Sequence, residues 1–155
     1  MDSRHSTFKN IWLVDDDLDD HLVFEGALNQ VLPLASLTKF ERCDQMLQQL
    51  EVSTPDLLFL DINLPEIDGI NCLKSFKDNA AFRKVPVIMF TISTYPRDIM
   101  SSYGYGATLY LVKPPTHQKL VNALRQLFKL NWDDPQHITD RHFVGDRFVP
   151  FSAEY

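Results

Sequence analysis

Cysteine and long apolar runs are scarce in this chain of 155 residues. The two cysteines, Cys43 and Cys72, form no metal-binding or redox motif, so we expect both to be buried packing residues in a reducing cytoplasm. No run approaches the roughly 18 apolar residues that a membrane-spanning helix needs, which argues against membrane insertion. Residues 1–7 contain no apolar segment, and we therefore expect no signal peptide.

Basic residues are also fewer than acidic ones. The chain has 15 Lys and Arg against 21 Asp and Glu, a formal net charge of −6. A mildly acidic protein of this kind is not expected to bind DNA directly. The length fits one domain with its own core, and 45% hydrophobic with 23% charged residues is typical of globular proteins.

Short apolar runs alternate with segments of helical periodicity along the chain. Leu57, Leu58, Phe59 and Leu60 are consecutive and large, which indicates a strand buried on both faces. The expected strands span 11–14, 35–40, 57–61, 86–91 and 108–112. The expected helices span 17–32, 44–50, 70–79, 96–103 and 116–130. This alternation predicts a doubly wound α/β fold, a flavodoxin-like (βα)5 parallel sheet of strand order 2-1-3-4-5.

Acidic residues stand where two of these strands end. Asp15 and Asp16 follow the first strand, and Asp61 stands at the carboxyl end of the third. A single Asp after a core strand is usually a turn former. In the expected order, however, both ends meet at the switch point where open α/β sheets bind ligands. Carboxylates this close repel each other unless a cation is present. Oxygen ligands of this kind predict Mg²⁺, with Mn²⁺ as the alternative ion, and a phosphoryl group.

The fourth and fifth strands add two further groups at the same edge. Thr91 ends the fourth strand with a hydroxyl, and Lys113 ends the fifth with an ammonium. A carboxylate nucleophile, a metal site, a hydroxyl and a lysine are the parts needed to form and hold an aspartyl phosphate.

Four separated motifs resemble those of one family, the receiver domains of two-component response regulators. The motifs are LVDDD at 13–17, LDINLP with DG at 60–69, VIMFT at 87–91, and GA with YLVKP at 106–114. The resemblance covers about residues 10–130. Within the family, the chain is similar to stand-alone receivers that are paired with phytochrome-like or multi-sensor histidine kinases.

This resemblance implies a metal site and an acceptor. Asp61 corresponds to the phosphoacceptor, and Asp16 to a direct Mg²⁺ ligand. Asp15 corresponds to a residue that acts largely through water, and Asn63 to one that offers its backbone carbonyl to the metal. Gly69 marks the loop that follows.

The resemblance also implies a switch. Thr91 corresponds to the hydroxyl that moves toward the phosphoryl group, and Tyr110 to the aromatic residue that moves inward with it. Lys113 corresponds to the phosphate-binding lysine, and the bond before Pro114 is expected to be cis. Ile92 departs from the common small residue at its position. We expect its bulk to hinder attacking water and to lengthen the lifetime of the phosphoryl group.

The function implied is that of a single-domain response regulator rather than an enzyme. It would receive its phosphoryl group from a sensor histidine kinase or a histidine phosphotransfer protein and signal through its surface to another protein. One alternative is a degenerate receiver that acts as a constitutive interaction module, although the intact site argues against it. Another is an FMN protein or a phosphatase of similar topology. Asp17, Asp19 and Asp20 are interpreted as helix-start residues, and His21 as a surface residue.

The two ends lie outside the receiver pattern. Residues 1–9 read as a polar tail, and residues 131–155 as an aromatic extension without a helical signal. Gly145-Asp146 between two short apolar segments indicates a type II′ hairpin. Isolated hairpins are marginal in water, so we expect the extension to pack on the receiver or on a second chain, with a homodimer as one outcome.

Overall fold

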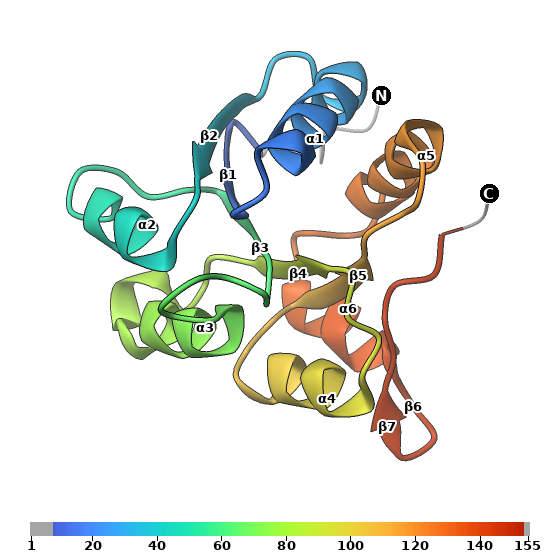
Figure 1. Cartoon of the computed structure of the whole chain (residues 1–155). Helices are drawn as coiled ribbons and strands as arrows, with labels where there is room; N and C mark the ends of the chain where they lie inside the picture. The colour runs from blue at the N-terminus through green and yellow to red at the C-terminus, as the bar shows by residue number, and fades with distance from the viewer. Residues whose placement is uncertain (1–7, 154–155) are drawn as a thin grey trace.

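The computed structural model describes residues 8–153 and contains the expected five-stranded parallel sheet (Figure 1). The strand order is β2-β1-β3-β4-β5. Its strands are β1 (Asn10–Val14), β2 (Ser36–Phe40), β3 (Leu57–Leu60), β4 (Val87–Thr91) and β5 (Leu109–Val112). The predicted fold class and strand order are therefore confirmed.

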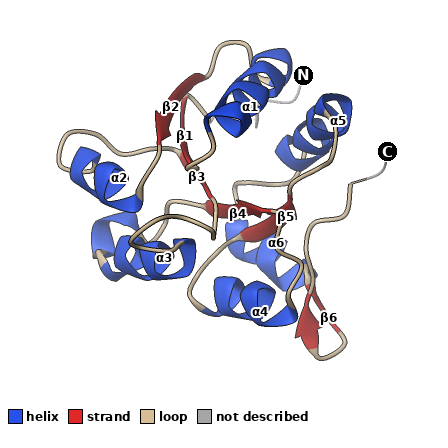
Figure 2. Ribbon diagram, viewed as in Figure 1, coloured by secondary structure: helices blue, strands red, loops and turns tan. Residues whose placement is uncertain are grey.

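Helices cover both faces of the sheet, as Figures 1 and 2 show. Helices α1 (Leu18–Val31) and α5 (His117–Phe128) lie on one face. The other face is covered by α2 (Cys43–Gln49), α3 (Gly69–Asp78) and α4 (Pro96–Gly104), with a 3₁₀ turn η2 (Ala80–Phe82) after α3. No helix within 8–153 is long and apolar enough to span a bilayer.

The strands are apolar on both sides because each face packs against helices. Leu57 and Phe59 of β3 point to the α1–α5 layer, whereas Leu58 and Leu60 point to the opposite layer. All four are fully buried. Phe59 meets Phe24 of α1 at 4.8 Å between ring centroids in an edge-on arrangement. This packing places the end of β3 in the middle of the molecule.

The register brings the carboxyl ends of neighbouring strands together. Val14 of β1 pairs with Leu60 of β3, so Asp15 and Asp61 follow paired positions. Thr91 of β4 pairs with Val112 of β5, and Lys113 comes directly after. The residues expected to form the site therefore leave the sheet at one edge.

The segment after α5 contains a helix that the sequence reading missed. Helix α6 (Pro135–Arg141) is capped by Asp134, whose side chain accepts a hydrogen bond from the His137 backbone N–H. An Asp at the cap and a Pro at the first helical position are a known start signal, and seven residues were too few to show periodicity. The expectation of no helix here is wrong.

The predicted hairpin is present as β6 (Phe143–Val144) and β7 (Arg147–Phe148). Gly145 has φ 69° and Asp146 does not have a positive φ, which is the pattern of a type II′ turn. The hairpin lies beside α4, at the lower right in Figure 1.

The extension contacts both core layers. Trp132 is buried, stacks edge-on against Phe8 at 5.5 Å and donates its indole N–H to the Leu127 carbonyl. Ile138 of α6 is buried in the same layer. On the other side of the sheet, Phe148 stacks on Tyr103 of α4 at 4.6 Å between centroids.

The cysteine expectation is corrected by the structure. Cys43 and Cys72 are both buried, as predicted, but their sulfur atoms are joined in a disulfide. They lie 29 positions apart, so only the packing of α2 beside α3 reveals that they are neighbours.

Candidate functional site

The acidic site is built on backbone hydrogen bonds between neighbouring strands. The Asp61 N–H donates to the Val14 carbonyl at 3.0 Å, and the Asp15 N–H donates to the Phe40 carbonyl at 3.0 Å. Both carboxylates therefore begin from backbone that is held by the sheet. Their positions follow from the strand order and do not depend on a mobile loop.

Three carboxylates converge at this edge. One oxygen each of Asp15, Asp16 and Asp61 lies within 4.8 Å of the others. Asp15 and Asp61 are buried, whereas Asp16 is exposed, so the group opens to solvent on the Asp16 side. The backbone N–H of Asn63 donates to the Asp61 carboxylate at 3.3 Å.

Lys113 reaches into this group from the end of β5. Its Nζ lies 2.8 Å from Asp15, 3.1 Å from Asp61 and 2.7 Å from Asp20. The ammonium thus joins residues that are up to 98 positions apart in the chain. It is the cation that holds the site's carboxylates together in this structure.

Burial and pairing shift the titration of these groups. Burial raises the pKa of the Asp15 carboxyl, and the hydrogen bonds from Lys113 and from the Asp17 N–H only partly offset this effect. Burial alone would lower the pKa of the Lys113 ammonium, but its bonds to Asp15 and Asp20 and the charge of Asp61 outweigh burial and raise it. Lys113 is therefore a permanent cation of the site.

A hydroxyl network lies beside the carboxylates at the end of β4. Thr91 is fully buried, and its hydroxyl accepts the Ser93 N–H at 3.4 Å. Tyr110 is also fully buried and donates its phenol to the Ser93 carbonyl at 2.8 Å. The Ser93 hydroxyl in turn donates to Asp98 at 2.6 Å. Thr91 and Tyr110 thus meet on one short segment, which links β4 and β5 to the start of α4.

Comparison with known proteins identifies the family. The description "Response regulator receiver domain" matches residues 11–125, which is most of the chain. The chain belongs to this family. A receiver domain is a phosphoacceptor signalling module rather than an enzyme.

Curated relatives contain the receiver as one part of a longer protein. The DNA-binding transcriptional regulator NtrC of Proteus hauseri is 34% identical over 105 residues, which cover 68% of this chain and 21% of the relative. NtrC of Klebsiella pneumoniae is 38% identical over 103 residues, which cover 66% of this chain and 21% of the relative. The chain thus spans about a fifth of the length of these relatives.

Solved structures of similar fold include phytochrome response regulators. The phosphorylated cyanobacterial phytochrome response regulator RcpA has a TM-score of 0.71 and 25% identity, covering 77% of this chain and 91% of that one. The Mn²⁺-bound form of the response regulator Rcp1 has a TM-score of 0.69 and 27% identity, with the same coverage. The predicted resemblance to receivers of phytochrome systems is therefore confirmed.

The receiver's residues fit a divalent cation. When all are ionised, Asp15, Asp16, Asp20 and Asp61 leave an excess of three negative charges over Lys113. An oxygen-only set of this charge suits a hard divalent ion. An Asp triad of this kind is typical of the divalent-metal site of receivers.

Two residues near the site differ from the sequence interpretation. Asp20 was assigned only to the start of a helix, but its carboxylate is bonded to Lys113. It lies in the first turn of α1, directly after the loop that carries Asp15 and Asp16, and this closeness in sequence was the available signal. His21 was assigned to the surface, yet it is buried and its Nε2 lies 2.5 Å from the Asp15 carbonyl. Asp17 does cap α1, as predicted.

The loop after Asp61 approaches the acceptor closely at Gly69. A Cβ at this position would lie 2.0 Å from the Asp61 carbonyl oxygen and 2.6 Å from the Ile62 Cα. The Gly69 N–H donates to the Ile62 carbonyl at 2.8 Å. Gly69 is thus required because α3 begins directly against the backbone of Asp61.

The expectation of a cis bond before Pro114 is wrong for this structure. Every peptide bond in the described part of the chain is trans, including Lys113–Pro114. A trans bond is the more stable form for most X–Pro pairs. Lys113 reaches the carboxylates of Asp15 and Asp61 with this geometry.

Proposed function

We propose that Asp61 is the phosphoacceptor of a response regulator that works as a stand-alone receiver. The main observation in support is that one ammonium, that of Lys113, contacts the Asp61 and Asp15 carboxylates beside the exposed Asp16. Asp61 directly follows the central strand β3 and is buried. It can thus present one carboxylate oxygen to a phosphoryl donor while Lys113 remains close to the other groups.

The chemistry follows from these contacts. A carboxylate oxygen of Asp61 attacks the phosphorus atom of a phosphohistidine, the P–N bond breaks, and its electron pair returns to the imidazole. Mg²⁺, or Mn²⁺, held by Asp15, Asp16, Asp61 and the Asn63 carbonyl would supply positive charge for the phosphoryl oxygens. The Lys113 ammonium neutralises another oxygen.

Thr91 and Tyr110 would transmit the effect of phosphorylation from the acidic site to the α4 surface. The Thr91 hydroxyl would leave the Ser93 N–H and donate to a phosphoryl oxygen, because the new anion is the stronger acceptor. Tyr110 is bonded to the same Ser93 segment, so its position depends on where that segment lies. The Thr91–Tyr110 pair is therefore the proposed switch between the site and the α4 surface.

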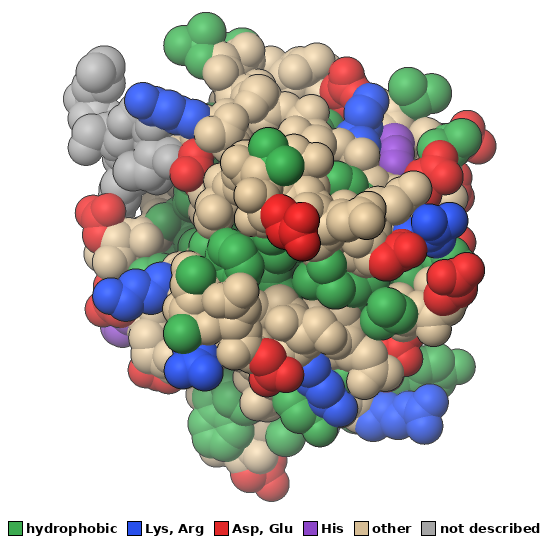
Figure 3. Space-filling view, turned by 90° about the vertical axis from the view of Figure 1, so that its left-hand side faces the viewer, with side chains coloured by type: hydrophobic (Ala, Val, Ile, Leu, Met, Phe, Trp, Pro, Cys, Tyr) green, Lys and Arg blue, Asp and Glu red, His purple; other side chains and the backbone are tan. Residues whose placement is uncertain are grey.

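The phosphoryl donor is proposed to be a sensor histidine kinase or a histidine phosphotransfer protein in the cytoplasm. Stand-alone action is supported by RcpA, of whose chain this one covers 91%. We propose an output through a protein partner without direct DNA binding. This is supported by the net charge of −6 and by the mixture of acidic and basic side chains on the β2–α2 side of the molecule (Figure 3).

The test is incubation with Mg²⁺ and acetyl phosphate, read by intact mass. We expect one added phosphoryl group that requires Mg²⁺ and is absent from Asp61→Asn. Asp19→Asn is the matched control, because Asp19 is an exposed carboxylate of the neighbouring helix. Undiminished labelling of Asp61→Asn would refute the acceptor. If the folded wild-type protein takes up no phosphate, the alternative of a constitutive interaction module is favoured.

We further propose that residues 131–155 form an extension that packs on the receiver and supports a homodimer. In support, Phe143 and Val144 of β6 remain exposed, the other hairpin strand β7 contacts α4, and α4 is itself partly apolar at the exposed Met100. Light scattering on the wild type and on Phe143→Ser with Val144→Ser tests the dimer. We expect the phosphorylated wild type to be the larger species. A monomer in both phosphorylation states would refute it.

A further inference from the structure

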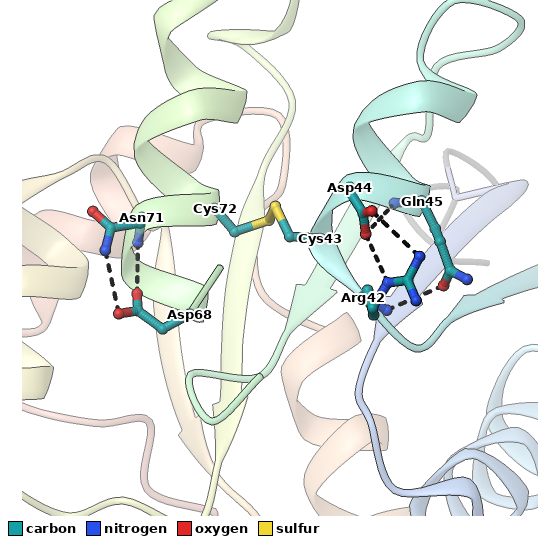
Figure 4. Close-up of a disulfide and its surroundings, with 7 residues drawn as sticks. All are labelled: Arg42, Cys43, Asp44, Gln45, Asp68, Asn71 and Cys72. Atoms are coloured by element: carbon teal, nitrogen blue, oxygen red, sulfur yellow. Dashed lines mark hydrogen bonds and ion pairs between the residues drawn. A yellow bond between two sulfur atoms is a disulfide. The ribbon is translucent and has the colours of Figure 1, made fainter. Parts of the chain in front are cut away.

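The Cys43–Cys72 disulfide joins two helices at their first turns. Cys43 is the first residue of α2 and Cys72 lies in the first turn of α3, with their Cα atoms 5.8 Å apart (Figure 4). This separation allows the bond without movement of the backbone. Both sulfurs are buried between α2 and α3 on the sheet face opposite α1 and α5.

Each cysteine lies in a turn that is ordered by its own caps. Beside Cys43, the Gln45 side chain accepts the Arg42 N–H at 3.2 Å, and Arg42 is paired with Asp44. Beside Cys72, the Asp68 side chain accepts the Asn71 N–H at 2.9 Å. Figure 4 shows both capped turns facing each other across the bond. The disulfide therefore links the capped first turns of two helices.

These two turns lie next to backbone that supports the acidic site. On the α2 side, the Phe40 carbonyl three residues before Cys43 accepts the Asp15 N–H. On the α3 side, the Cys72 N–H donates to the Asp68 carbonyl, and Gly69 in the same turn lies directly against the Asp61 carbonyl. The disulfide thus connects the segment that contacts the Asp15 backbone to the segment that contacts the Asp61 backbone.

A permanent structural disulfide does not suit the compartment in which a receiver meets its kinase. Cytosolic disulfides are usually transient, and they are catalytic or redox-sensing. Helix α2 has only seven residues, a length that is marginal without tertiary contacts, and its carboxyl end leads into the exposed segment 51–54. Local opening of α2 would expose both sulfurs without disturbing the central strands.

We propose that Cys43 and Cys72 form a reversible thiol–disulfide site that couples the redox state of the cell to the acidic site; the coupling to phosphorylation rests on the proposed function. One cysteine thiolate attacks a sulfur of oxidised glutathione, and one glutathione thiolate leaves. The second cysteine thiolate attacks the mixed disulfide, and the second glutathione leaves. The protein loses two protons and two electrons, and glutathione disulfide gains them.

The bonded form is the more active form. The disulfide fixes the distance between the backbone segment that contacts Asp15 and the one that contacts Asp61. A fixed distance favours simultaneous contact of both carboxylates with a cation and a phosphoryl group. In the reduced form the hydrogen bonds of the sheet still hold the backbones of Asp15 and Asp61, but α2 is free to move relative to α3. We expect phosphorylation by acetyl phosphate to be about fivefold slower after reduction, at the lower end of typical coupling between linked sites.

The experiment compares the full chain in oxidised glutathione and in dithiothreitol. Maleimide labelling of the denatured protein, read by mass, counts free thiols, and we expect none and two respectively. The phosphorylation rate and the Mg²⁺ affinity by calorimetry are measured in both states. The matched control is the double variant Cys43→Ala with Cys72→Ala, which should resemble the reduced wild type in either reagent. If this variant does not fold, the single variant Cys72→Ala, which cannot close the bond, serves the same purpose.

Each outcome decides one point. Two free thiols after prolonged oxidation would overturn the site. A complete disulfide with unchanged phosphorylation rate and Mg²⁺ affinity would overturn the coupling. If neither state accepts phosphate, the proposed function fails, and the coupling is decided by Mg²⁺ affinity alone. A redox effect that persists in the double variant would also refute the assignment to these cysteines.

Discussion

Removing one oxygen atom, by Tyr103→Phe, should loosen the contact between the receiver and its carboxyl-terminal extension. The Tyr103 hydroxyl accepts the Tyr110 N–H at 3.1 Å and donates to the Val149 carbonyl at 2.9 Å. It therefore joins α4, the edge strand β5 and the segment after β7 through one group. Burial raises the pKa of this phenol, so the hydroxyl keeps its proton at neutral pH.

The cost can be worked out from these two bonds. Tyr110 is fully buried, so its N–H would be left without a partner, which costs about 1–3 kcal/mol. Val149 is only half-buried, and water can replace the hydroxyl at its carbonyl at a cost of about 0.5 kcal/mol. We expect the free energy of unfolding to fall by about 2 kcal/mol, or a Tm lower by about 4–8 °C for a chain of this size.

Urea unfolding followed by circular dichroism measures this loss, and limited proteolysis reports release of the extension. Tyr105→Phe is the matched control, because Tyr105 is exposed and its ring stays under the Lys74 ammonium, 4.1 Å from the ring centroid, in either form. The control should change stability by only a few tenths of a kcal/mol. If both variants unfold at the same urea concentration, the Tyr103 hydroxyl does not hold the extension.

Three further predictions concern the loop, the phenols and the site. Gly69→Ala should lower stability by about 1–3 kcal/mol and slow phosphorylation, since its Cβ would overlap the Asp61 carbonyl. The control Gly104→Ala, whose Cβ meets no other atom, should be neutral or stabilising. Equal effects of the two substitutions would contradict the argument. Burial raises the pKa of Tyr110 to about 12, so the neutral phenol stabilises the folded state, and this contribution to stability should be lost as pH rises from about 10 to 12. In an absorbance titration, Tyr110→Phe should show one fewer tyrosine that ionises above its ordinary pH range. Ile92→Ala should shorten the lifetime of the phosphoryl group, and equal decay rates would show that this 70% exposed side chain does not hinder water.

The sheet and the main site groups could be predicted because the signals were local and repeated. The apolar run of β3 indicated burial on both faces, and the alternation of strands and helices left few possible orders. The order alone brought Asp15 beside Asp61, and it brought Lys113 to the same edge. The chemistry of these residue types then suggested a cation and a phosphoryl group.

The remainder depended on contacts that no local pattern records. The partnership of Cys43 with Cys72 needs the distance between two helices, and the bond from Asp20 to Lys113 needs the rotation of α1 about its axis. Helix α6 was short and had only its cap as a signal. The bond before Pro114 was inferred from resemblance, and the energy difference between its two forms is small enough for context to decide.

The outer edge of strand β5 is covered by hydrogen bonds, and this limits how the protein can aggregate or assemble. Tyr110 turns both its N–H and its carbonyl away from the sheet, where Tyr103 and the Phe151 N–H satisfy them. An uncovered edge strand is a template for pairing with a strand of another molecule. While the extension is in place, neither a second receiver nor a misfolded neighbour can add a strand beside β5. Loss of the last segment would convert a protected boundary into a site for strand addition.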